Sequence, residues 1–355
     1  MTILVTGGCG FIGTNLIRDF VKLDGEKIIN LDKLTYAGNK ENLSDLNPDL
    51  YELVVGDIGD AKLVSKIFKD FKPKAIVHLA AESHVDRSIL GPLEFIQTNV
   101  FGTFTLLEEA KSYYESLAQN EKEDFRMLCV STDEVFGSLE AYDAAFTEKT
   151  AYAPNSPYSA SKAGADHLAR AYFKTYGLPV IISNCSNNYG PYQFPEKLIP
   201  LVTLNALSLK TLPIYGDGLQ IRDWLHVSDH SRALRLILKK GKVGESYNIG
   251  GNSEKTNIEV VRLCCELLDK KRPRGENDTY LSLISHVKDR PGHDKRYAID
   301  SSKIEETLGF KPNVTFEEGI SQTIDWYLSN SEWVERVQSG EYKNWMSTQY
   351  GENND

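Results

Sequence analysis

The sequence predicts an α/β protein: a doubly wound parallel sheet with a smaller, mixed α/β lobe in the C-terminal part of the chain. Short apolar runs alternate with longer segments of helical period. The runs at 3–5 and 75–77 contain no polar residue, as expected of strands that are buried on both faces. A glycine-rich turn separates the first apolar run from the first helical segment. Together these observations predict a sheet whose strands are connected by covering helices.

The elements follow in chain order. We expect strands near 2–6, 27–31, 51–55, 75–79, 126–131 and 179–184, and helices near 11–23, 61–71, 93–117 and 158–176. After about residue 187 prolines and glycines become frequent, which predicts the smaller lobe, with a helix near 228–239 and a strand at 246–249 returning to the sheet. The predicted sheet domain is 1–186 with returns near 224–250, and the lobe is 187–223 and 251–355. Within that lobe we expect a charged surface loop near 270–278 and a frayed polar tail at 341–355.

Composition narrows the class of protein. With 355 residues, of which 41% are hydrophobic, the chain can bury a large core. The net charge of -10 argues against nucleic acid or an anionic membrane as the main partner. No run of 18 apolar residues occurs, and the first residues form a core strand, so we expect a cytoplasmic protein. The five scattered cysteines favour reduced thiols and lack zinc-ligand spacing, so no metal site is predicted.

The glycine-rich turn has the spacing of a dinucleotide-binding site. Gly7, Gly10 and Gly13 lie between the first strand and the first helix, where helix N–H groups could approach a pyrophosphate. A glycine triplet alone is weak, because glycines also mark ordinary turns, but this position makes the signal strong. Asp32 ends the second strand, where a carboxylate can hold both ribose hydroxyls. It would repel a 2′-phosphate, so NAD is favoured over NADP, although the adjacent Lys33 tempers that preference.

Two later strand ends extend this Rossmann-type site. Asp57 and Ile58 follow the third strand and could hold the adenine edge. Leu79, Ala80 and Ala81 end the fourth strand with small residues, which leaves room for the dinucleotide.

A second set of residues carries acid–base chemistry. Tyr158 and Lys162 are four apart on a predicted helix, hence on one face, and the lysine can favour the phenolate, which acts as the base when an alcohol is oxidised. Tyr/Lys pairs with this spacing often lie on solvent-exposed helix faces and have no catalytic role. The dinucleotide site and the polar strand end at 131–132 make a catalytic role more specific here. The adjacent Asp133 and Glu134 could supply an acid and a base, which simple hydride transfer does not need. The alternative for that pair is a helix N-terminus with acids in the first turn.

These motifs resemble the extended short-chain dehydrogenase/reductase superfamily. Within it, the chain is similar to the dTDP-glucose 4,6-dehydratase family almost end to end, through the segments 31–39, 80–88, 131–135, 186–192, 195–200 and 289–294. Related sugar-nucleotide 4-epimerases share the glycines and the Tyr/Lys pair but lack the Asp-Glu pair. One departure is Asn184, where the family usually carries arginine; we expect a structural contact at the strand end.

The resemblance implies a cycle of oxidation, elimination and reduction. Tyr158 would take the C4 hydroxyl proton while the C4 hydride passes to NAD+, with Thr132 hydrogen-bonding the C4 oxygen. Glu134 would then remove the C5 proton, and Asp133 would protonate the C6 hydroxyl as water leaves. Return of the hydride to C6 and of a proton to C5 gives dTDP-4-keto-6-deoxyglucose.

The resemblance also implies the binding residues. Arg222 and Arg290 would grip the diphosphate, since the planar guanidinium suits phosphate oxygens, although either alone is more often structural. The expected cofactor set, besides the glycines, Tyr158 and Lys162, is Phe11, Ile12, Asp32, Lys33, Leu34, Thr35, Asp57, Ile58, Leu79, Ala80, Ala81, Ser83, Thr98 and Asn188. The expected substrate set, besides the two arginines and Thr132, is Ser83, Asn187, Lys197, Leu198, Pro213, Ile214, Tyr215, Asn257, Asp289 and His293. For His84 and Asp86 we expect structural hydrogen bonds.

Alternative activities stay open at this point, and the sequence also predicts an oligomeric state. A dehydratase acting on a UDP- or CDP-linked sugar is one alternative enzyme, because thymine and uracil differ by one methyl group. A 4-epimerase is the other, although the Asp133-Glu134 pair argues against it. A non-catalytic NAD sensor or scaffold would have no need of the four acid–base residues together. The helical segments 93–117 and 158–176 are apolar on more than one face, which, with the family resemblance, predicts a homodimer.

Overall fold

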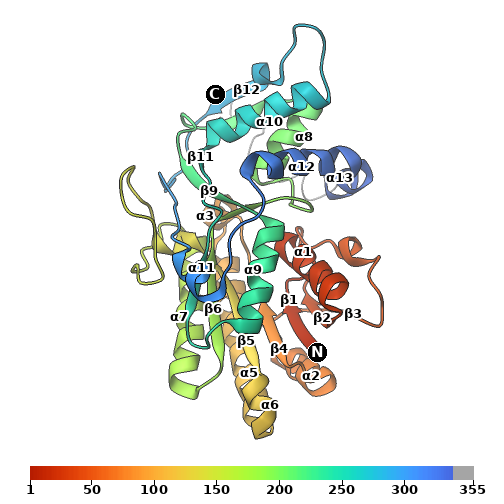
Figure 1. Cartoon of the computed structure of the whole chain (residues 1–355), viewed down its shortest axis with the longest axis vertical. Helices are drawn as coiled ribbons and strands as arrows, with labels where there is room; N and C mark the ends of the chain where they lie inside the picture. Colours follow the sequence, from red (N-terminus) through yellow and green to blue (C-terminus); the bar gives the residue numbers. More distant parts are fainter. Residues whose placement is uncertain (339–355) are drawn as a thin grey trace.

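The computed structural model describes residues 1–338, and a seven-stranded parallel sheet forms its larger half (Figure 1). The strand order is β10-β6-β5-β4-β1-β2-β3. The strands are β1 (Thr2–Thr6), β2 (Lys27–Asp32), β3 (Tyr51–Val55), β4 (Ala75–His78), β5 (Arg126–Thr132), β6 (Val180–Cys185) and β10 (Ser246–Ile249). The predicted fold class is confirmed. The strand at 246–249 is β10, which pairs with β6 at the edge of the sheet.

Both faces of the sheet are covered by helices, and each face has its own core. Along β1, Ile3 and Val5 pack into one cluster and Leu4 into the other, because successive strand side chains point to opposite faces. The first cluster contains side chains of α1 (Phe11–Asp19), α9 (Val227–Lys240) and α11 (Ser302–Leu308). The second contains side chains of α2 (Ala61–Phe71), α5 (Thr103–Ser116) and α7 (Pro157–Tyr176). Continuous apolar runs therefore mark strands that have no solvent face.

The helices differ from the expected ranges in three places. The segment predicted as one helix at 93–117 is α4 (Pro92–Phe95), a π-helical stretch η3 (Ile96–Gly102) and α5, preceded by α3 (Val85–Leu90). The segment predicted as a helix at 11–23 is α1 followed by a second π-helical stretch, η1 (Phe20–Asp24). The sequence analysis missed α6 (Gln119–Asp124), which buries no residue and so has no apolar face to detect.

The C-terminal lobe lies above the sheet in Figure 1 and contains two small sheets. One joins β7 (Asn187–Tyr189), β9 (Ile221–His226) and β11 (Glu254–Thr256), and the other pairs β8 (Leu212–Tyr215) with β12 (Ile284–Val287). The helices are α8 (Leu198–Leu207), α10 (Asn257–Lys271), α12 (Phe316–Ser329) and α13 (Ser331–Val337). The loop expected at 270–278 begins after α10 and ends before the short helix η5 (Tyr280–Leu283). The tail expected at 341–355 lies outside the described residues.

The strand order creates the place for a ligand. From β1 the chain moves to β2 and β3 on one side, and then crosses back to β4 on the other side. In open parallel sheets, ligands bind at the carboxyl ends of the strands where the order reverses in this way. No helix within residues 1–338 has both the length and the apolar character needed to cross a membrane.

Candidate active site

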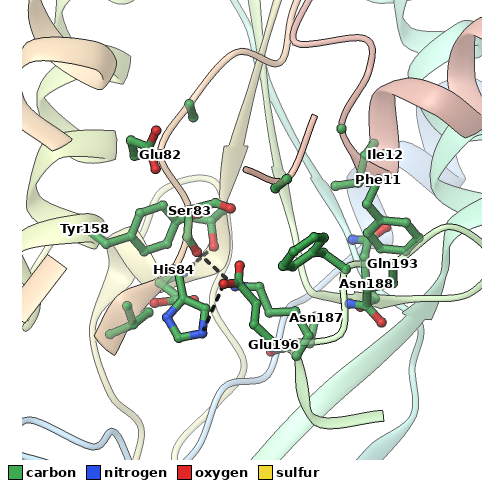
Figure 2. A pocket seen from close by; sticks show the side chains of 18 of the residues that line it. Phe11, Ile12, Glu82, Ser83, His84, Tyr158, Asn187, Asn188, Gln193 and Glu196 are labelled. Atoms are coloured by element: carbon green, nitrogen blue, oxygen red, sulfur yellow. Dashed lines mark hydrogen bonds and ion pairs between the residues drawn. The ribbon is translucent and has the colours of Figure 1, made fainter. Parts of the chain in front are cut away.

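A cavity of about 460 Å³ lies between the carboxyl ends of the sheet strands and the C-terminal lobe. Figure 2 shows Tyr158, Glu82 and Ser83 on one side of it, and Phe11, Ile12 and Asn188 on the other. All of the residues expected at the site line this cavity except Leu34 and Asp289. One cavity thus joins the predicted dinucleotide turn, the acid–base residues and the arginines.

The two exceptions have local explanations. The Leu34 N–H donates to Asp32 Oδ1 over 2.8 Å, and the Leu34 side chain packs against the core of the sheet domain. The Asp289 carboxylate accepts from the backbone N–H of Arg290 and from His293 Nδ1, at 2.8 and 2.6 Å. Asp289 therefore shapes its own loop instead of lining the cavity.

The glycines of the turn meet different demands. Gly7 has φ +72°, and a Cβ there would lie 2.7 Å from the backbone of Ala80. A Cβ on Gly13 would lie 2.5 Å from the Gly7 carbonyl oxygen, so glycine is required at both positions by the fold. A Cβ on Gly10 would meet the Gly7 oxygen alone, at 3.3 Å, although Gly10 lines the cavity. The missing side chain at Gly10 leaves a cradle that fits a pyrophosphate at the start of α1.

A fourth glycine, Gly8, was missed by the sequence analysis. Its N–H donates to Asn30 Oδ1 over 3.0 Å, and a Cβ would lie 2.3 Å from that same oxygen. Asn30 is fully buried in β2 and also donates to Cys9 Sγ and to the Tyr51 hydroxyl. The turn is therefore fastened to the second strand, and the only sequence signal was the glycine pair itself.

The charges at the end of β2 fit NAD. Asp32 is buried, and its Oδ2 accepts from the N–H of Cys9 over 2.8 Å, which links it to the glycine turn. Lys33 Nζ is 2.8 Å from Asp57 Oδ2. Because this ion pair offsets the lysine charge, Lys33 offers little attraction to a 2′-phosphate.

The adjacent acids lie on a tight turn. β5 ends at Thr132, and a 3-10 helix, η4 (Asp133–Phe136), follows at once. Thr132 Oγ1 caps that helix by accepting from the Glu134 N–H over 3.2 Å. Asp133 and Glu134 therefore do lie in the first turn of a helix, which was the alternative interpretation of the pair. Both carboxyls nevertheless line the cavity as well. The turn explains how two neighbours, which would point apart in a strand, reach the same space.

A buried network supports this turn from below. Asp166 Oδ2 accepts from Ser131 Oγ over 2.6 Å and from the Tyr152 hydroxyl over 3.0 Å. Asn184 Nδ2 donates to the Thr132 carbonyl oxygen over 3.1 Å and lies 3.4 Å from the same tyrosine hydroxyl. Asn184 thus makes a structural contact between the ends of β5 and β6.

Tyr158 and Lys162 lie in the first two turns of α7. The helix begins with a capping box at Ser156 and Pro157 at its first position, which fixes where the tyrosine falls. Both side chains are buried, and Lys162 Nζ donates to the Val130 carbonyl oxygen over 2.8 Å. Burial and the nearby charge of Glu134 raise the pKa of Tyr158 well above its usual value. In the protein without ligands, Tyr158 is a neutral phenol at pH 7.

The two acids differ in their electrostatic surroundings. Asp133 is 1% exposed, and burial together with the charges of Glu134 and Asp223 raises its pKa well above the usual value. Burial also raises the pKa of Glu134, but the cations of Arg290 and Lys197 oppose that rise. The surroundings thus favour a proton more strongly on Asp133 than on Glu134, where the two cations offset part of the effect of burial.

Cationic side chains of the C-terminal lobe face the acids across the cavity. Arg222 is 5% exposed; its Nη1 and Nη2 donate to the carbonyl oxygens of Ile221 and Asp294 at 2.7 and 3.0 Å, and its guanidinium lies over the Tyr297 ring. Lys197 Nζ donates to the Ser83 carbonyl oxygen over 2.9 Å. These cations suit an anionic group on the substrate.

Glu196 and Tyr297 line the cavity but were not singled out by the sequence analysis. Glu196 Oε1 accepts from the Tyr36 hydroxyl over 3.0 Å, and its Oε2 lies 3.5 Å from Arg87 Nε. Burial raises the pKa of Glu196 to about 7. Its place within the matched segment 195–200 was the one available signal.

The chain is similar to known sugar-nucleotide dehydratases over almost its whole length. Residues 4–323 match the model of the GDP-mannose 4,6-dehydratase family. A dTDP-glucose 4,6-dehydratase of Salmonella typhimurium is 54% identical over 99% of both chains, and one of Xanthomonas campestris pv. campestris is 57% identical over 96% of this chain and 97% of the relative.

Solved structures of related enzymes have a similar fold. A dTDP-glucose 4,6-dehydratase of Streptomyces venezuelae, solved with NAD bound, has a TM-score of 0.86 and 46% identity over 95% of this chain and 100% of its own. A UDP-glucose 4-epimerase of Thermotoga maritima has a TM-score of 0.81 but 28% identity, over 93% of this chain and 100% of its own.

Proposed function

The chain belongs to the dTDP-glucose 4,6-dehydratase family of extended short-chain dehydrogenases/reductases, and we propose that it removes water across C5–C6 of dTDP-glucose. One observation carries the proposal: the Asp133–Glu134 turn and the Tyr158/Lys162 pair line the same cavity as the dinucleotide turn. A 4-epimerase would need the Tyr158/Lys162 pair and the cofactor but not the carboxyls of Asp133 and Glu134. NAD+, when bound, accepts a hydride from the sugar and later returns it.

Tyr158 accepts the proton of the C4 hydroxyl in this proposal. Because burial raises the pKa of Tyr158, the phenolate must be favoured by positive charge, which Lys162 brings from one helical turn away. Thr132, at the end of β5, donates a hydrogen bond to the C4 oxygen. These residues hold and move a single proton at C4.

Water loss is divided between the two acids. Glu134 removes the C5 proton, and Asp133 protonates the C6 hydroxyl as it leaves. The raised pKa of Asp133 keeps a proton available for the leaving group, whereas nearby cations such as Arg290 favour the base form of Glu134. The reverse assignment would require the more strongly desolvated carboxyl to be the charged one.

The C-terminal lobe holds the nucleotide. Arg222 and Arg290 bind the diphosphate, and Leu198, Pro213 and Tyr215 frame the nucleoside. The cation set and the apolar lining of this end of the cavity support that arrangement.

Product analysis tests the function directly. The enzyme is incubated with dTDP-, UDP- or CDP-glucose, and the 4-keto product is followed by its alkaline absorbance. We expect product from dTDP-glucose with the highest kcat/KM. A 4-epimer would establish the epimerase alternative, and no reaction with any of the three would favour the NAD sensor. Faster turnover of UDP- or CDP-glucose would reassign the base preference.

We also propose a homodimer built on the helices after β4. Exposed apolar side chains gather on α3, α4, η3 and α5, namely Ile89, Leu90, Leu93, Ile96, Phe101 and Phe104, of which Leu90, Leu93 and Phe101 are more than 60% exposed. Such a patch is typical of a protein–protein interface. Sedimentation should give a dimer, and Leu93→Asp should shift it toward monomer. A wild-type monomer that is independent of dilution would contradict the dimer.

We infer that the enzyme works in the cytoplasm. All five cysteines are buried and free, as expected in a reducing compartment. Fractionation of cells that make the chain should find it with cytosolic markers, and recovery with secreted proteins would contradict this.

A further inference from the structure

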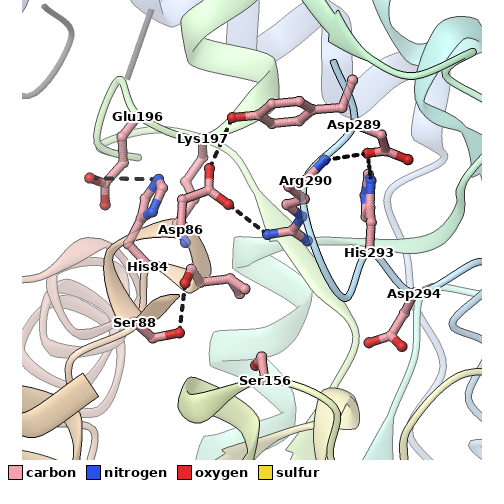
Figure 3. Close-up of polar contacts among 12 residues, drawn as sticks. His84, Asp86, Ser88, Ser156, Glu196, Lys197, Asp289, Arg290, His293 and Asp294 are labelled. Atoms are coloured by element: carbon pink, nitrogen blue, oxygen red, sulfur yellow. Dashed lines mark hydrogen bonds and ion pairs between the residues drawn. The ribbon is translucent and has the colours of Figure 1, made fainter. Parts of the chain in front are cut away.

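Asp86, a buried carboxylate of the sheet domain, contacts two cavity-lining side chains of the C-terminal lobe. It lies in α3, the first helix after β4, and is 8% exposed. Asp86 Oδ1 accepts from Arg290 Nη1 over 2.9 Å, and Oδ2 accepts from the Tyr215 hydroxyl over 3.2 Å (Figure 3). Each oxygen of one carboxylate therefore holds a different side chain of the other lobe.

The two donors come from β8 and from the loop that follows its partner strand β12. Tyr215 is the last residue of β8 and pairs with Val287, the last residue of β12, and Arg290 follows shortly after. The Asp289 carboxylate holds the backbone N–H of Arg290, as Figure 3 also shows. Asp289 thus orients the main chain of the loop, and Asp86 orients the side chain that projects from it.

The charge of Asp86 is unexpected at this place. It lines the cavity beside groups that the proposed function assigns to an anionic diphosphate. A carboxylate by itself repels such a ligand, so its direct Coulomb effect on binding is unfavourable. Its benefit must come through the groups that it holds.

The geometry of Arg290 supplies that benefit. A guanidinium binds phosphate best when its plane is fixed, because the donors then match two oxygens at once. Asp86 fixes one edge at Nη1, whereas the buried Nε has no hydrogen-bond partner among the described residues. The side chain is therefore oriented while donor capacity is kept.

We propose that Asp86 is a positioning residue that orients Arg290 to bind the diphosphate of the sugar nucleotide and holds Tyr215 where it frames the nucleoside. The inference rests on the proposed function, which assigns the diphosphate to Arg290. Asp86 belongs to the half that carries the dinucleotide turn, whereas Arg290 and Tyr215 belong to the other half. The ion pair between Asp86 and Arg290 thus fixes the position of the diphosphate-binding arginine relative to the half that binds the cofactor.

A double-mutant cycle distinguishes positioning from a structural role. The variants are Asp86→Ala, Arg290→Ala and the double variant, each as full-length enzyme with NAD+, with dTDP binding measured by calorimetry and dTDP-glucose turnover by steady-state kinetics. In the wild-type background, Asp86→Ala should weaken dTDP binding and raise KM about tenfold, with kcat little changed. In the Arg290→Ala background the sign should reverse, because the remaining carboxylate only repels the ligand. There, removal of Asp86 should tighten dTDP binding several-fold.

The other outcomes each decide a point. Weaker binding of similar size in both backgrounds would show a merely structural contact and overturn the inference. Tighter binding in the wild-type background would show that direct repulsion dominates, and would also overturn it. If Arg290→Ala leaves dTDP affinity unchanged, the assignment of the diphosphate in the proposed function is wrong instead.

Two further variants keep the test valid if Asp86→Ala folds poorly. Asp86→Asn keeps the shape and one acceptor but removes the charge, so its KM should lie between those of wild type and Asp86→Ala. Trp333→Phe is the matched control, because it also removes one hydrogen bond between the halves, from Trp333 Nε1 to Asn42 Oδ1 at 2.7 Å, and neither residue lines the cavity. Its KM should stay within twofold of wild type; a rise equal to that of Asp86→Asn would show that any loss of contact between the halves suffices, and would overturn the inference.

Discussion

The two walls of the cavity are built from different kinds of structure. The cofactor wall is made by the ends of regular strands and by backbone groups, with Gly7, Gly10 and Gly13 placed where side chains would collide or block. The substrate wall is made by long charged side chains, such as Arg222 and Arg290, from short strands and loops. A backbone wall is specified by local geometry, whereas a side-chain wall depends on partners elsewhere in the chain. The two walls should therefore respond differently to substitution.

The largest effects are expected where chemistry, and not binding, is removed. Both Tyr158 and Glu134 sit on the sheet domain, one on α7 and the other just after β5. Tyr158→Phe should lower turnover by about 10³-fold or more and form no NADH in a single turnover, because the first proton transfer is lost. Glu134→Gln should lower turnover similarly but accumulate NADH, since oxidation at C4 precedes proton removal at C5. Absorbance at the NADH band in rapid-mixing experiments distinguishes them; equal loss of NADH in both would contradict the assigned roles.

On the cofactor wall, neighbouring glycines should fail for different reasons. Gly7→Ala forces a side chain into a positive-φ position and against the Ala80 backbone, so it should destabilise the fold by about 2–4 kcal/mol. Gly10→Ala meets only one oxygen, so its stability should stay within about 0.5 kcal/mol of wild type while NAD+ affinity falls. Chemical denaturation and NAD+ titration measure the two effects. A stable Gly7→Ala enzyme, or unchanged NAD+ affinity in Gly10→Ala, would remove the distinction.

The difference between the two walls also explains which parts of the site could be predicted from the sequence. The glycine turn, Asp32 and the Tyr158/Lys162 pair were predictable because each depends on spacing within one strand–helix unit. The contacts of Asp86 with Arg290 and of Glu196 with Tyr36 join residues 204 and 160 positions apart, so no local pattern encodes them.

Irregular backbone conformations could not be predicted from the sequence either. The π-helical stretch Ile96–Gly102 keeps the composition of an ordinary helix, and its boundaries could not be read from periodicity. Leu34 follows a matched strand end but turns into the core, because its backbone N–H is used by Asp32. Proximity in sequence to a motif therefore did not guarantee a place in the cavity.

On the substrate wall, a conservative change should affect binding alone. Arg222→Lys keeps the charge but loses the planar fork that contacts the carbonyl oxygens of Ile221 and Asp294. We expect the KM for dTDP-glucose to rise about tenfold, because roughly one charged hydrogen bond is lost, while NAD+ affinity stays unchanged. Steady-state kinetics and NAD+ titration provide both values. A parallel loss of NAD+ affinity would mean that the two walls are not energetically separate.

The last effect concerns stability alone, namely the cost of a charge buried in the substrate wall. Burial raises the pKa of Glu196 from 4.5 to about 7, so the folded chain holds a proton there that the unfolded chain has already lost. The free energy of unfolding therefore falls as pH rises from about 4.5 to 7 and is level above that range. Glu196→Gln removes this dependence and should stabilise the protein at pH 8, relative to pH 5, by about 2 kcal/mol.

The exposed capping residue Glu259 provides a control of opposite sign. Hydrogen bonds from Thr256 lower its pKa, so its contribution to stability is present above pH 4.5 and is lost as pH falls. Urea denaturation of both variants across pH 3–8 should therefore show two opposite trends relative to wild type. Glu196→Gln should gain stability between about pH 4.5 and 7. Glu259→Gln should lose stability as pH rises toward 4.5 and stay level above it. If Glu196→Gln instead loses stability toward pH 8, Glu196 is charged and stabilising in the folded protein. Its contacts with Tyr36 and Arg87 would then outweigh desolvation, and long charged side chains would not be a source of instability in this wall.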